Sequence, residues 1–264
     1  MAPAGYLLGV IDLAQIERRI TAWLSGEWEY LERFRKGENP YIGTASRFYG
    51  RQITKDDKEE YQAGKVIELQ CQYQSGGPKI VQTLRNAGII ISQEEGIAAR
   101  DAFRSEHPGT VSLWNFAGRM ISRLAGGQPC QWGPMVVKDG KIFGPGGTWL
   151  DYTTLEYYKD SETGDEYWRV RKRHGWTKLY GGKLVENVVQ WLARIVLSQA
   201  MSRIMAKGFR IVTTSHDELV ILIPDDARSS RMLEWCRQEM ARTPDWLPGI
   251  PLDAEATIGK RYSK

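Results

Sequence analysis

Two acidic positions far apart in the sequence stand where strands are predicted to end or turn. Asp12 follows an apolar run, and Asp217 and Glu218 lie between two β-branched apolar runs that predict a hairpin. An isolated buried carboxylate takes up a proton unless a positive group keeps it ionised. Carboxylates at the ends of buried strands therefore indicate a site that holds a cation.

Each of these positions also has a purely structural interpretation. Acidic residues are common in solvent-facing turns, which would account for Asp217 and Glu218. Apolar residues recur at helical spacing from Leu13 to Gly26. Asp is a favoured N-cap residue, so Asp12 taken alone is more simply read as the cap of that helix. Neither position, taken alone, shows whether its carboxylate binds a cation or only forms part of a turn or helix cap.

A third candidate is a stripe of Lys65, Leu69 and Tyr73, spaced by four residues. We expect a helix here that is capped by Thr54 and runs to about Gln74, so the stripe would occupy one face. An ammonium group suits a phosphate and an aromatic ring suits a base, so the face could bind a nucleotide. The alternative is a helix on the core with a lysine whose charge reaches water.

The remaining elements frame these candidates. A β-hairpin is predicted from the alternating segments 149–158 and 166–171. Apolar periodicity and Gly or Pro punctuation predict six more helices, at 41–49, 80–87, 93–104, 110–124, 183–207 and 226–242.

The composition is that of an ordinary globular protein. The 264 residues are 42% hydrophobic and 26% charged, with a net charge of +4, which permits a polyanionic partner without requiring one. Cys71, Cys130 and Cys236 are far apart and have no metal-like spacing, so we expect free thiols. We find neither a signal peptide nor a membrane-length apolar run and predict a cytoplasmic protein.

Taken together, the motifs resemble those of family A DNA polymerases of the bacteriophage type. The first motif is similar to the segment 12–19, which reads Asp-Leu-Ala-Gln-Ile-Glu-Arg-Arg, and the second to Gly64, Lys65 and Tyr73. The third is similar to 216–218, His-Asp-Glu. Phage-like signatures at 180–190 and 259–264 agree in order and spacing. A joint match is far more specific than any single motif.

The resemblance implies template-directed DNA polymerisation. Asp12, Asp217 and the carbonyl of Leu13 would hold two Mg²⁺ ions, for which Mn²⁺ could substitute, and Glu218 would support them. Neutralising charge and positioning the reactants are what nucleotidyl transfer requires of a protein. The sites that the resemblance implies for the deoxynucleotide are Gln15, Glu17, Lys65 and Tyr73, and those for primer–template DNA are Arg19, Gln190 and His216. Of these, Glu17 would exclude nucleotides that carry a ribose 2′-hydroxyl, so we expect a preference for deoxynucleotides. Arg19 could instead form a surface salt bridge, and Gln190 could be an ordinary helix-face amide.

Three positions depart from the family pattern. Tyr61 stands where an arginine usually contacts the triphosphate, Leu69 where an aromatic residue is frequent, and Thr148 where an arginine is presented. A lost charged hydrogen bond costs about 1.5–3 kcal/mol, which would weaken nucleotide binding and leave the metal site intact. Lys58 or Arg51 could supply the missing charge.

The fold class that follows is α+β, an antiparallel-sheet palm with an inserted helical fingers subdomain, without thumb or exonuclease domains. We expect palm at 1–38, fingers at 39–135, and palm again at 136–264 with a β-hairpin insertion, the long helix and the acidic hairpin. The chain would be either a piece of a longer polymerase or one half of a polymerase split between two polypeptides, and we favour the second. The thumb and the 3′–5′ exonuclease would then come from a separate N-terminal partner, in the host cytoplasm if a phage encodes the chain.

Two other classes of function compete with this one. The first is a binding subunit that holds primer–template but has lost turnover through Tyr61. The second is a nuclease that uses two metal ions. Retained Asp12, Asp217 and Lys65 count against the binding subunit, because paired carboxylates repel the DNA backbone. Lys65 and Tyr73, on a helix of their own, are suited to an incoming nucleotide, which counts against the nuclease.

Overall fold

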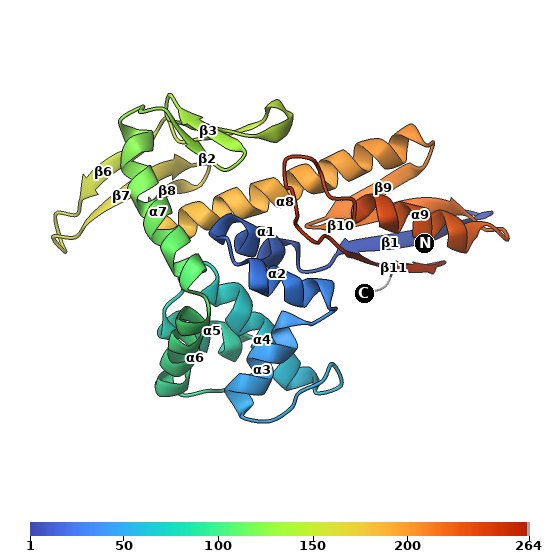
Figure 1. Cartoon of the computed structure of the whole chain (residues 1–264), viewed down its shortest axis with the longest axis horizontal. Helices are drawn as coiled ribbons and strands as arrows, with labels where there is room; N and C mark the ends of the chain where they lie inside the picture. The colour runs from blue at the N-terminus through green and yellow to red at the C-terminus, as the bar shows by residue number, and fades with distance from the viewer. Residues whose placement is uncertain (263–264) are drawn as a thin grey trace. The chain divides into compact units, whose positions relative to one another are not determined.

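A computed structural model describes residues 1–262, and Ser263 and Lys264 at the end of the terminal signature lie outside the described residues. The chain forms two compact units, residues 1–20 with 189–264, and residues 21–188. Figure 1 shows the order of the elements. Helices α2 to α7 lie in sequence between the first strand and the other sheets, and all strand pairs described are antiparallel. The predicted α+β class with antiparallel sheets is confirmed.

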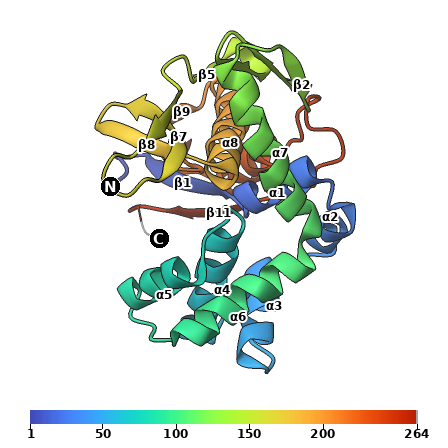
Figure 2. The ribbon, with the colours of Figure 1, turned by 90° about the vertical axis from the view of Figure 1, so that its left-hand side faces the viewer.

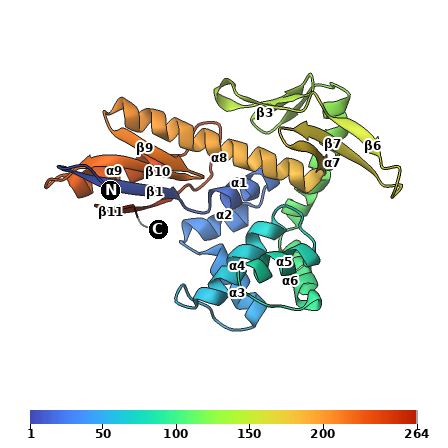
Figure 3. The same ribbon diagram turned by 180° about the vertical axis from the view of Figure 1, so that it is seen from behind.

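The first unit is built on a four-stranded sheet. Its order is β11-β1-β10-β9 (Figure 3). The strands are β1 (Tyr6–Leu13), β9 (Arg210–Ser215), β10 (Glu218–Pro224) and β11 (Ala254–Gly259). The two ends of the described chain meet here, since the Ala2 N–H donates to the Lys260 carbonyl at 2.8 Å. The predicted hairpin of β9 and β10 is confirmed.

Alternation along β1 gives the sheet two different faces. A Cβ atom built on Gly9 would lie 2.9 Å from Leu233 of helix α9 (Ser229–Met240), so α9 packs closely on this face. The opposite face carries an apolar cluster of Leu8, Val10 and Val220. Because side chains two residues apart share a face, Asp12 lies on the face of this cluster.

The passage from β1 into helix α1 (Ile16–Ser25) differs from the prediction. Asp12 lies within the strand, and the helix begins at Ile16 instead of Leu13. Gln15, between them, has φ of +47°, in the left-handed region that interrupts a regular helix. Asp12 is therefore not the N-cap of α1, and the capping interpretation is wrong.

The second unit contains a group of helices that Figure 2 shows in blue to green. Its helices are α2 (Trp28–Arg35), α3 (Pro40–Tyr49), α4 (Lys58–Cys71), α5 (Gly77–Asn86), α6 (Gln93–Glu106) and α7 (Pro108–Ala125). A Cβ atom on Gly64 would come within 2.7 Å of the Ala45 Cβ atom. Glycine at this position thus lets α3 and α4 approach closely. The four helices predicted between 41 and 124, apart from the one with Lys65, are confirmed.

Helix α4 corrects two predictions. Asp57, not Thr54, occupies the N-cap position, and the Asp57 carboxylate accepts hydrogen bonds from the Thr54 N–H at 2.8 Å and hydroxyl at 3.0 Å. The helix ends at Cys71, so Tyr73 lies beyond it, and Gln74 has φ of +68°. Only Lys65 and Leu69 of the predicted stripe share a helical face.

Two small sheets follow α7 in the second unit. One has the order β2-β3-β4-β5 and the other β6-β7-β8. Their strands are β2 (Cys130–Trp132), β3 (Met135–Lys138), β4 (Lys141–Phe143), β5 (Trp149–Asp151), β6 (Glu156–Lys159), β7 (Glu166–Lys172) and β8 (Gly175–Leu179), with a 3₁₀ turn η1 (Pro145–Gly147) before β5.

The predicted hairpin is therefore partly wrong. β6 pairs with β7 as expected, but Trp149 pairs with Phe143 in the other sheet. The long helix α8 (Gly181–Ala206) and the helix α9 confirm the last two helix predictions. Among residues 1–262, no helix is long and apolar enough to cross a lipid bilayer.

Candidate active site

Strand pairing in the first unit brings the two acidic motifs to one edge of the sheet. β1 and β10 are antiparallel, and Asp12 stands opposite Glu218 in their register. The Leu13 N–H donates to the carbonyl of Asp217 at 3.3 Å, so the main chain of the first motif is bonded to the hairpin turn. Asp12 and Asp217 are both half-buried. The predicted meeting of two distant acidic motifs on adjacent strands is confirmed.

Glu218 is the most deeply buried acid of this group, with 1% of its surface exposed. Its Oε1 accepts a hydrogen bond from the Tyr262 hydroxyl at 2.8 Å. The signature at 259–264 includes Tyr262, but sequence reasoning assigned this residue no role of its own. No local pattern could have predicted its contact with Glu218, because Tyr262 follows the last strand and is distant from Glu218 in the sequence.

Glu255 is a second residue that the sequence did not single out. It stands opposite Asp12 on β11, while Glu218 stands opposite Asp12 on β10. Residues directly opposite each other in antiparallel strands share a face. Three carboxylates therefore form one row across three strands, and the register that creates this row is invisible in the sequence.

Three predicted site residues lie where β1 passes into α1, one in the turn and two in the helix. Arg19 is only 5% exposed, and its guanidinium donates to the carbonyl of Ala14 at 2.8 Å and to that of Pro251. It also donates to the Gln15 side chain at 3.4 Å. Arg19 is thus no surface salt bridge, and it fastens the start of α1. Glu17, in the first turn of α1, is half-buried.

The two other predicted DNA contacts are exposed. Gln190 lies on an exposed side of α8, and His216 lies at the tip of the acidic hairpin. His216 has φ of +53°. A positive φ at the first residue of a two-residue hairpin loop favours glycine, so a histidine there carries local backbone strain.

In the second unit, Lys65 is exposed on α4, and Tyr73 is half-buried just after that helix. The start of α8 holds the segment around Tyr73. The Gly182 N–H donates to the Gln74 side chain at 2.8 Å, and a Cβ on Gly182 would lie 2.5 Å from the Tyr73 carbonyl oxygen. Glycine at position 182, in the first turn of α8, therefore permits this close approach.

The structure shows the contacts of Tyr61, which departs from the family pattern, and of Arg51, which was considered as a replacement cation. The Tyr61 hydroxyl accepts a hydrogen bond from the Asn39 side chain at 3.3 Å, and its ring packs edge-on against Tyr41. Arg51, considered as a replacement cation, is bonded to Asp57 at 3.1 Å and also to Glu60. Its charge is therefore already engaged by carboxylates within the same unit.

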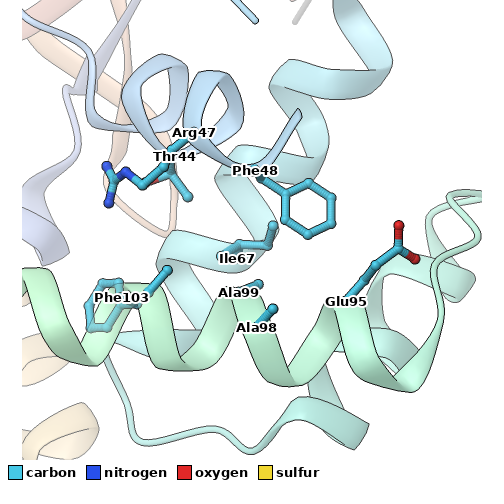
Figure 4. Close-up of a pocket in the computed structure, with 9 residues that line it drawn as sticks. Thr44, Arg47, Phe48, Ile67, Glu95, Ala98, Ala99 and Phe103 are labelled. Carbon is cyan, nitrogen blue, oxygen red and sulfur yellow. The ribbon is translucent and has the colours of Figure 1, made fainter. Parts of the chain in front are cut away.

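A hollow of about 220 Å³ lies on the other side of α4 (Figure 4). Its lining includes Ile67 of α4, Phe48 of α3, and Ala99 and Phe103 of α6. Residues two apart on a helix point about 200° apart at 100° per residue, so Ile67 faces away from Lys65. This hollow is mostly apolar and separate from the predicted nucleotide face.

The donor set at the sheet edge suits magnesium. Within residues 1–262 no group of three or more His, Cys, Asp or Glu side chains forms a ready-made metal cluster. Mg²⁺ is commonly held by one or two carboxylates together with substrate phosphates and water. Asp12 and the Leu13 carbonyl on β1, and Asp217 in the turn directly before β10, supply hard oxygen donors of this kind.

Comparison with known proteins identifies the relatives of the chain. No protein-family model matches it. A DNA polymerase of Bacillus phage SP02 is 30% identical over 270 residues, covering 97% of this chain and 41% of the phage protein. The chain is a homologue of the family A DNA polymerases.

More distant family A relatives match over the same extent. The thermostable DNA polymerase I of Thermus thermophilus is 22% identical, covering 99% of this chain and 28% of its own length. The DNA polymerase of Mycobacterium phage D29 is 23% identical, covering 99% of this chain and 35% of its own length. The chain thus spans less than half of each of these relatives.

A solved family A structure has a similar fold. The POL domain of Pol1 from M. smegmatis, in complex with DNA primer-template and dNTP, superimposes with a TM-score of 0.65. The match has 17% sequence identity and covers 98% of this chain and 40% of that chain. At this identity the likeness concerns the fold.

Proposed function

We propose that the chain carries the catalytic centre of a template-directed DNA polymerase that adds deoxynucleotides to a primer 3′-hydroxyl. One observation carries the proposal: two acidic motifs separated by about two hundred residues meet on bonded strands, with the Leu13 N–H on the Asp217 carbonyl at 3.3 Å. Homology to family A polymerases over 97% of the chain supports it.

In this proposal Asp12, Asp217 and the Leu13 carbonyl hold divalent metal, as two Mg²⁺ ions that Mn²⁺ can replace. When bound, the metal supplies charge neutralisation at the triphosphate and makes the primer hydroxyl easier to deprotonate. Glu218, whose side chain is fixed by the Tyr262 hydroxyl at 2.8 Å, supports the metal ligands from the strand beside Asp12. The protein's own contribution is to hold these oxygens in place.

The incoming deoxynucleotide would be bound by residues of both motifs. Lys65 neutralises phosphate charge, Tyr73 closes over the templating position, and Glu17 excludes a ribose 2′-hydroxyl. Gln15 contributes from the turn before α1, where the Arg19 guanidinium bonds its side chain. The segments 1–38 and 136–264 would form the palm, and 39–135 the fingers.

The primer–template would contact exposed side chains. Gln190 reaches the minor groove, where acceptors common to all base pairs permit checking without sequence preference. His216 meets the primer end from the hairpin tip. Arg19 is buried, so in the proposal it acts on the primer terminus by holding Gln15 and the start of α1 in place.

The proposal includes a partner fragment. The relatives are longer, since the chain spans 41% of the Bacillus phage SP02 polymerase, and a separate N-terminal polypeptide with thumb and 3′–5′ exonuclease would complete it. Because two relatives are phage enzymes, we place the activity in the cytoplasm of an infected host cell.

The alternative of a binding subunit without turnover is less well supported. The relatives are named DNA polymerases, and the main chain of β1 is bonded to the hairpin turn that carries Asp217. A nuclease would have no use for Lys65 and Tyr73 as a nucleotide-binding pair. The polymerase, the binding subunit and the nuclease each predict a different result in one primer-extension assay.

Primer extension with Mg²⁺ and deoxynucleotides tests the proposal, with the chain alone and with an added N-terminal polymerase fragment. Asp217→Ala should abolish extension. Asp225→Ala is the matched control, because this exposed acid at the far end of β10 is ion-paired with Lys260. Exposed pairs contribute little, so this control should extend normally.

Each outcome separates the alternatives. Extension that requires Asp217 supports the polymerase, and dependence on the added fragment supports the partner. No extension in any combination, with primer–template binding unchanged by Asp217→Ala, would favour the binding subunit. Shortening of the DNA in the absence of nucleotides would favour the nuclease.

A further inference from the structure

The sheet β6-β7-β8 in the second unit has two chemically different faces. In the antiparallel register Tyr158 stands opposite Tyr167, Arg169 stands between Glu156 and Lys178, and Arg171 stands opposite Trp176. Opposed residues share a face, as do residues two apart on one strand. One face therefore carries these seven residues, Glu156, Tyr158, Tyr167, Arg169, Arg171, Trp176 and Lys178, and we call it the outer face.

The opposite face is the one that packs on the protein. It carries Val170 and Leu179, which are 1% and 3% exposed. On the outer face, Trp176 is 43% exposed, and Arg171 and Lys178 are exposed as well. The strands of this sheet are drawn in yellow in Figure 1. The outer face is thus an open surface of aromatic rings and cations.

The rings and cations of the outer face are interleaved. The Arg169 guanidinium lies 3.5 Å from the centre of the Tyr158 ring and 4.4 Å from that of Trp176. The Lys178 ammonium lies 4.5 Å from the centre of the Tyr167 ring. These contacts hold the rings at fixed positions, so little conformational entropy is lost when a flat ligand stacks on them.

The charge of this face is positive. Glu156 is its one carboxylate, and it bonds Arg169 at 2.6 Å. Within residues 1–262 no carboxylate forms an ion pair with Arg171 or Lys178. Two cations therefore remain available for an anionic ligand beside the exposed Trp176 ring and two half-buried tyrosine rings.

We propose that the outer face of the β6-β7-β8 sheet binds single-stranded DNA. Bases stack on aromatic side chains and cations follow the phosphates in sites that bind single strands without sequence preference. Bases within a duplex are already stacked on each other, so a flat face of rings favours an unpaired strand. The choice of DNA rests on the proposed polymerase function, which supplies an unpaired template strand.

Fluorescence anisotropy with a labelled oligothymidine of about 20 nucleotides, in EDTA to exclude metal, tests the stacking part. Trp176→Ala should weaken binding about tenfold, the effect of losing one stacked base. Tyr157→Ala is the matched control, because Tyr157 is a 55% exposed ring on the other face of the same sheet. It should bind like the parent chain.

A second comparison tests the electrostatic part and does not depend on a large aromatic substitution. The double variant Arg171→Ala with Lys178→Ala should lower the slope of log affinity against log salt by about 0.7 per lost contact. Lys159→Ala is the control, since Lys159 belongs to the other face and pairs with Glu166 at 3.0 Å. Its slope should be unchanged.

The proposal is overturned if Trp176→Ala and the double variant bind as the parent does, or if duplex DNA binds the parent more tightly than the single strand. The proposed polymerase activity fails separately. A chain that binds oligothymidine through this face but never extends a primer would overturn only the activity. A chain that extends primers while Trp176→Ala and the double variant both bind normally would overturn only this surface.

Discussion

Gly182 lies directly against the main chain of Tyr73, so that a Cβ atom on the glycine would come 2.5 Å from the tyrosine carbonyl oxygen. The Gly182 N–H also donates to the Gln74 side chain at 2.8 Å. Gln74 has φ of +68°, which turns the chain sharply after α4. The first turn of α8 thus holds the residue that we propose closes over the templating base.

Gly182→Ala should displace this segment. Overpacking of this kind costs about 1–3 kcal/mol of stability, and the displaced Tyr73 should raise KM for deoxynucleotides more than it lowers kcat. Urea unfolding and steady-state primer extension measure the two effects. Gly118→Ala is the control, because a Cβ there meets nothing within 4 Å and alanine favours the helix. Equal KM values for both variants would contradict the role of this contact.

Tyr61 offers a gain-of-function prediction. Family A enzymes usually have arginine here, and the exposed Lys65 lies one helical turn further along α4. Tyr61→Arg should lower KM for deoxynucleotides by about tenfold, the lower end of what a charged hydrogen bond contributes. Tyr61→Phe, which only removes the hydroxyl that Asn39 bonds, should leave KM unchanged. An unchanged KM in the arginine variant would show that another cation already serves the triphosphate.

Glu17 gives a prediction on sugar selectivity. If its half-buried side chain fills the space of a ribose 2′-hydroxyl, Glu17→Ala should raise the incorporation of ribonucleotides relative to deoxynucleotides by at least tenfold. Competition between the two nucleotide types in primer extension measures this ratio. Glu29→Ala, in the first turn of α2, is the control and should keep the ratio of the parent. A ratio unchanged by Glu17→Ala would show that Glu17 does not exclude the ribose 2′-hydroxyl.

The sequence predicted those elements whose signals are local. Alternation and β-branched residues located β9 and β10, and the apolar period located α8. The meeting of Asp12 and Asp217 could be foreseen because both stand at strand ends, and the Asp12–Glu218 register agrees with that. The predicted start of α1 and the predicted end of α4 were wrong. Gln15 and Gln74, near these two ends, adopt left-handed backbone conformations, and a glutamine in the sequence rarely indicates such a conformation.

A second source of error and omission is strand pairing, which a local pattern does not specify. Trp149 was assigned to a strand with Tyr158, but its partner is Phe143 in another sheet. Tyr262 and Glu255 reach the acidic row only through the order β11-β1-β10. No sequence pattern near Tyr262 or Glu255 predicts this strand order.

His216 combines a predicted functional role with backbone strain. At φ of +53° glycine should be more stable than a residue with a Cβ by about 1 kcal/mol, so His216→Gly should unfold at higher urea than His216→Ala. Both variants lack the imidazole and should extend primers equally poorly, with reduced affinity for primer–template. Gly and Ala variants of equal stability would show that the turn tolerates the side chain without cost. Full extension by either would exclude the primer contact.

Burial of ionisable groups predicts how stability depends on alkaline pH. Burial, with a smaller effect of the nearby Glu68 carboxylate, raises the pKa of the Cys71 thiol to about 12 from an ordinary value of 9.0. Burial also raises the pKa of Cys236 to about 12. The folded state therefore keeps both protons when the unfolded chain has lost them. Their contribution to stability is complete below about pH 9 and is lost as pH rises towards 12.

Urea unfolding between pH 8 and 11 should thus show stability falling above pH 9, by up to about 1.4 kcal/mol per pH unit for each buried thiol. Cys71→Ala removes one of these groups and should make the fall shallower, even though its smaller side chain lowers stability at pH 8. Cys130→Ala is the matched cysteine variant, because it removes a thiol that is only half-buried. In the native protein at pH 8 a thiol reagent should modify Cys130 and spare the two buried thiols. Rapid modification of Cys71, or a slope that Cys71→Ala does not change, would show that α4 opens around this thiol more readily than its burial implies.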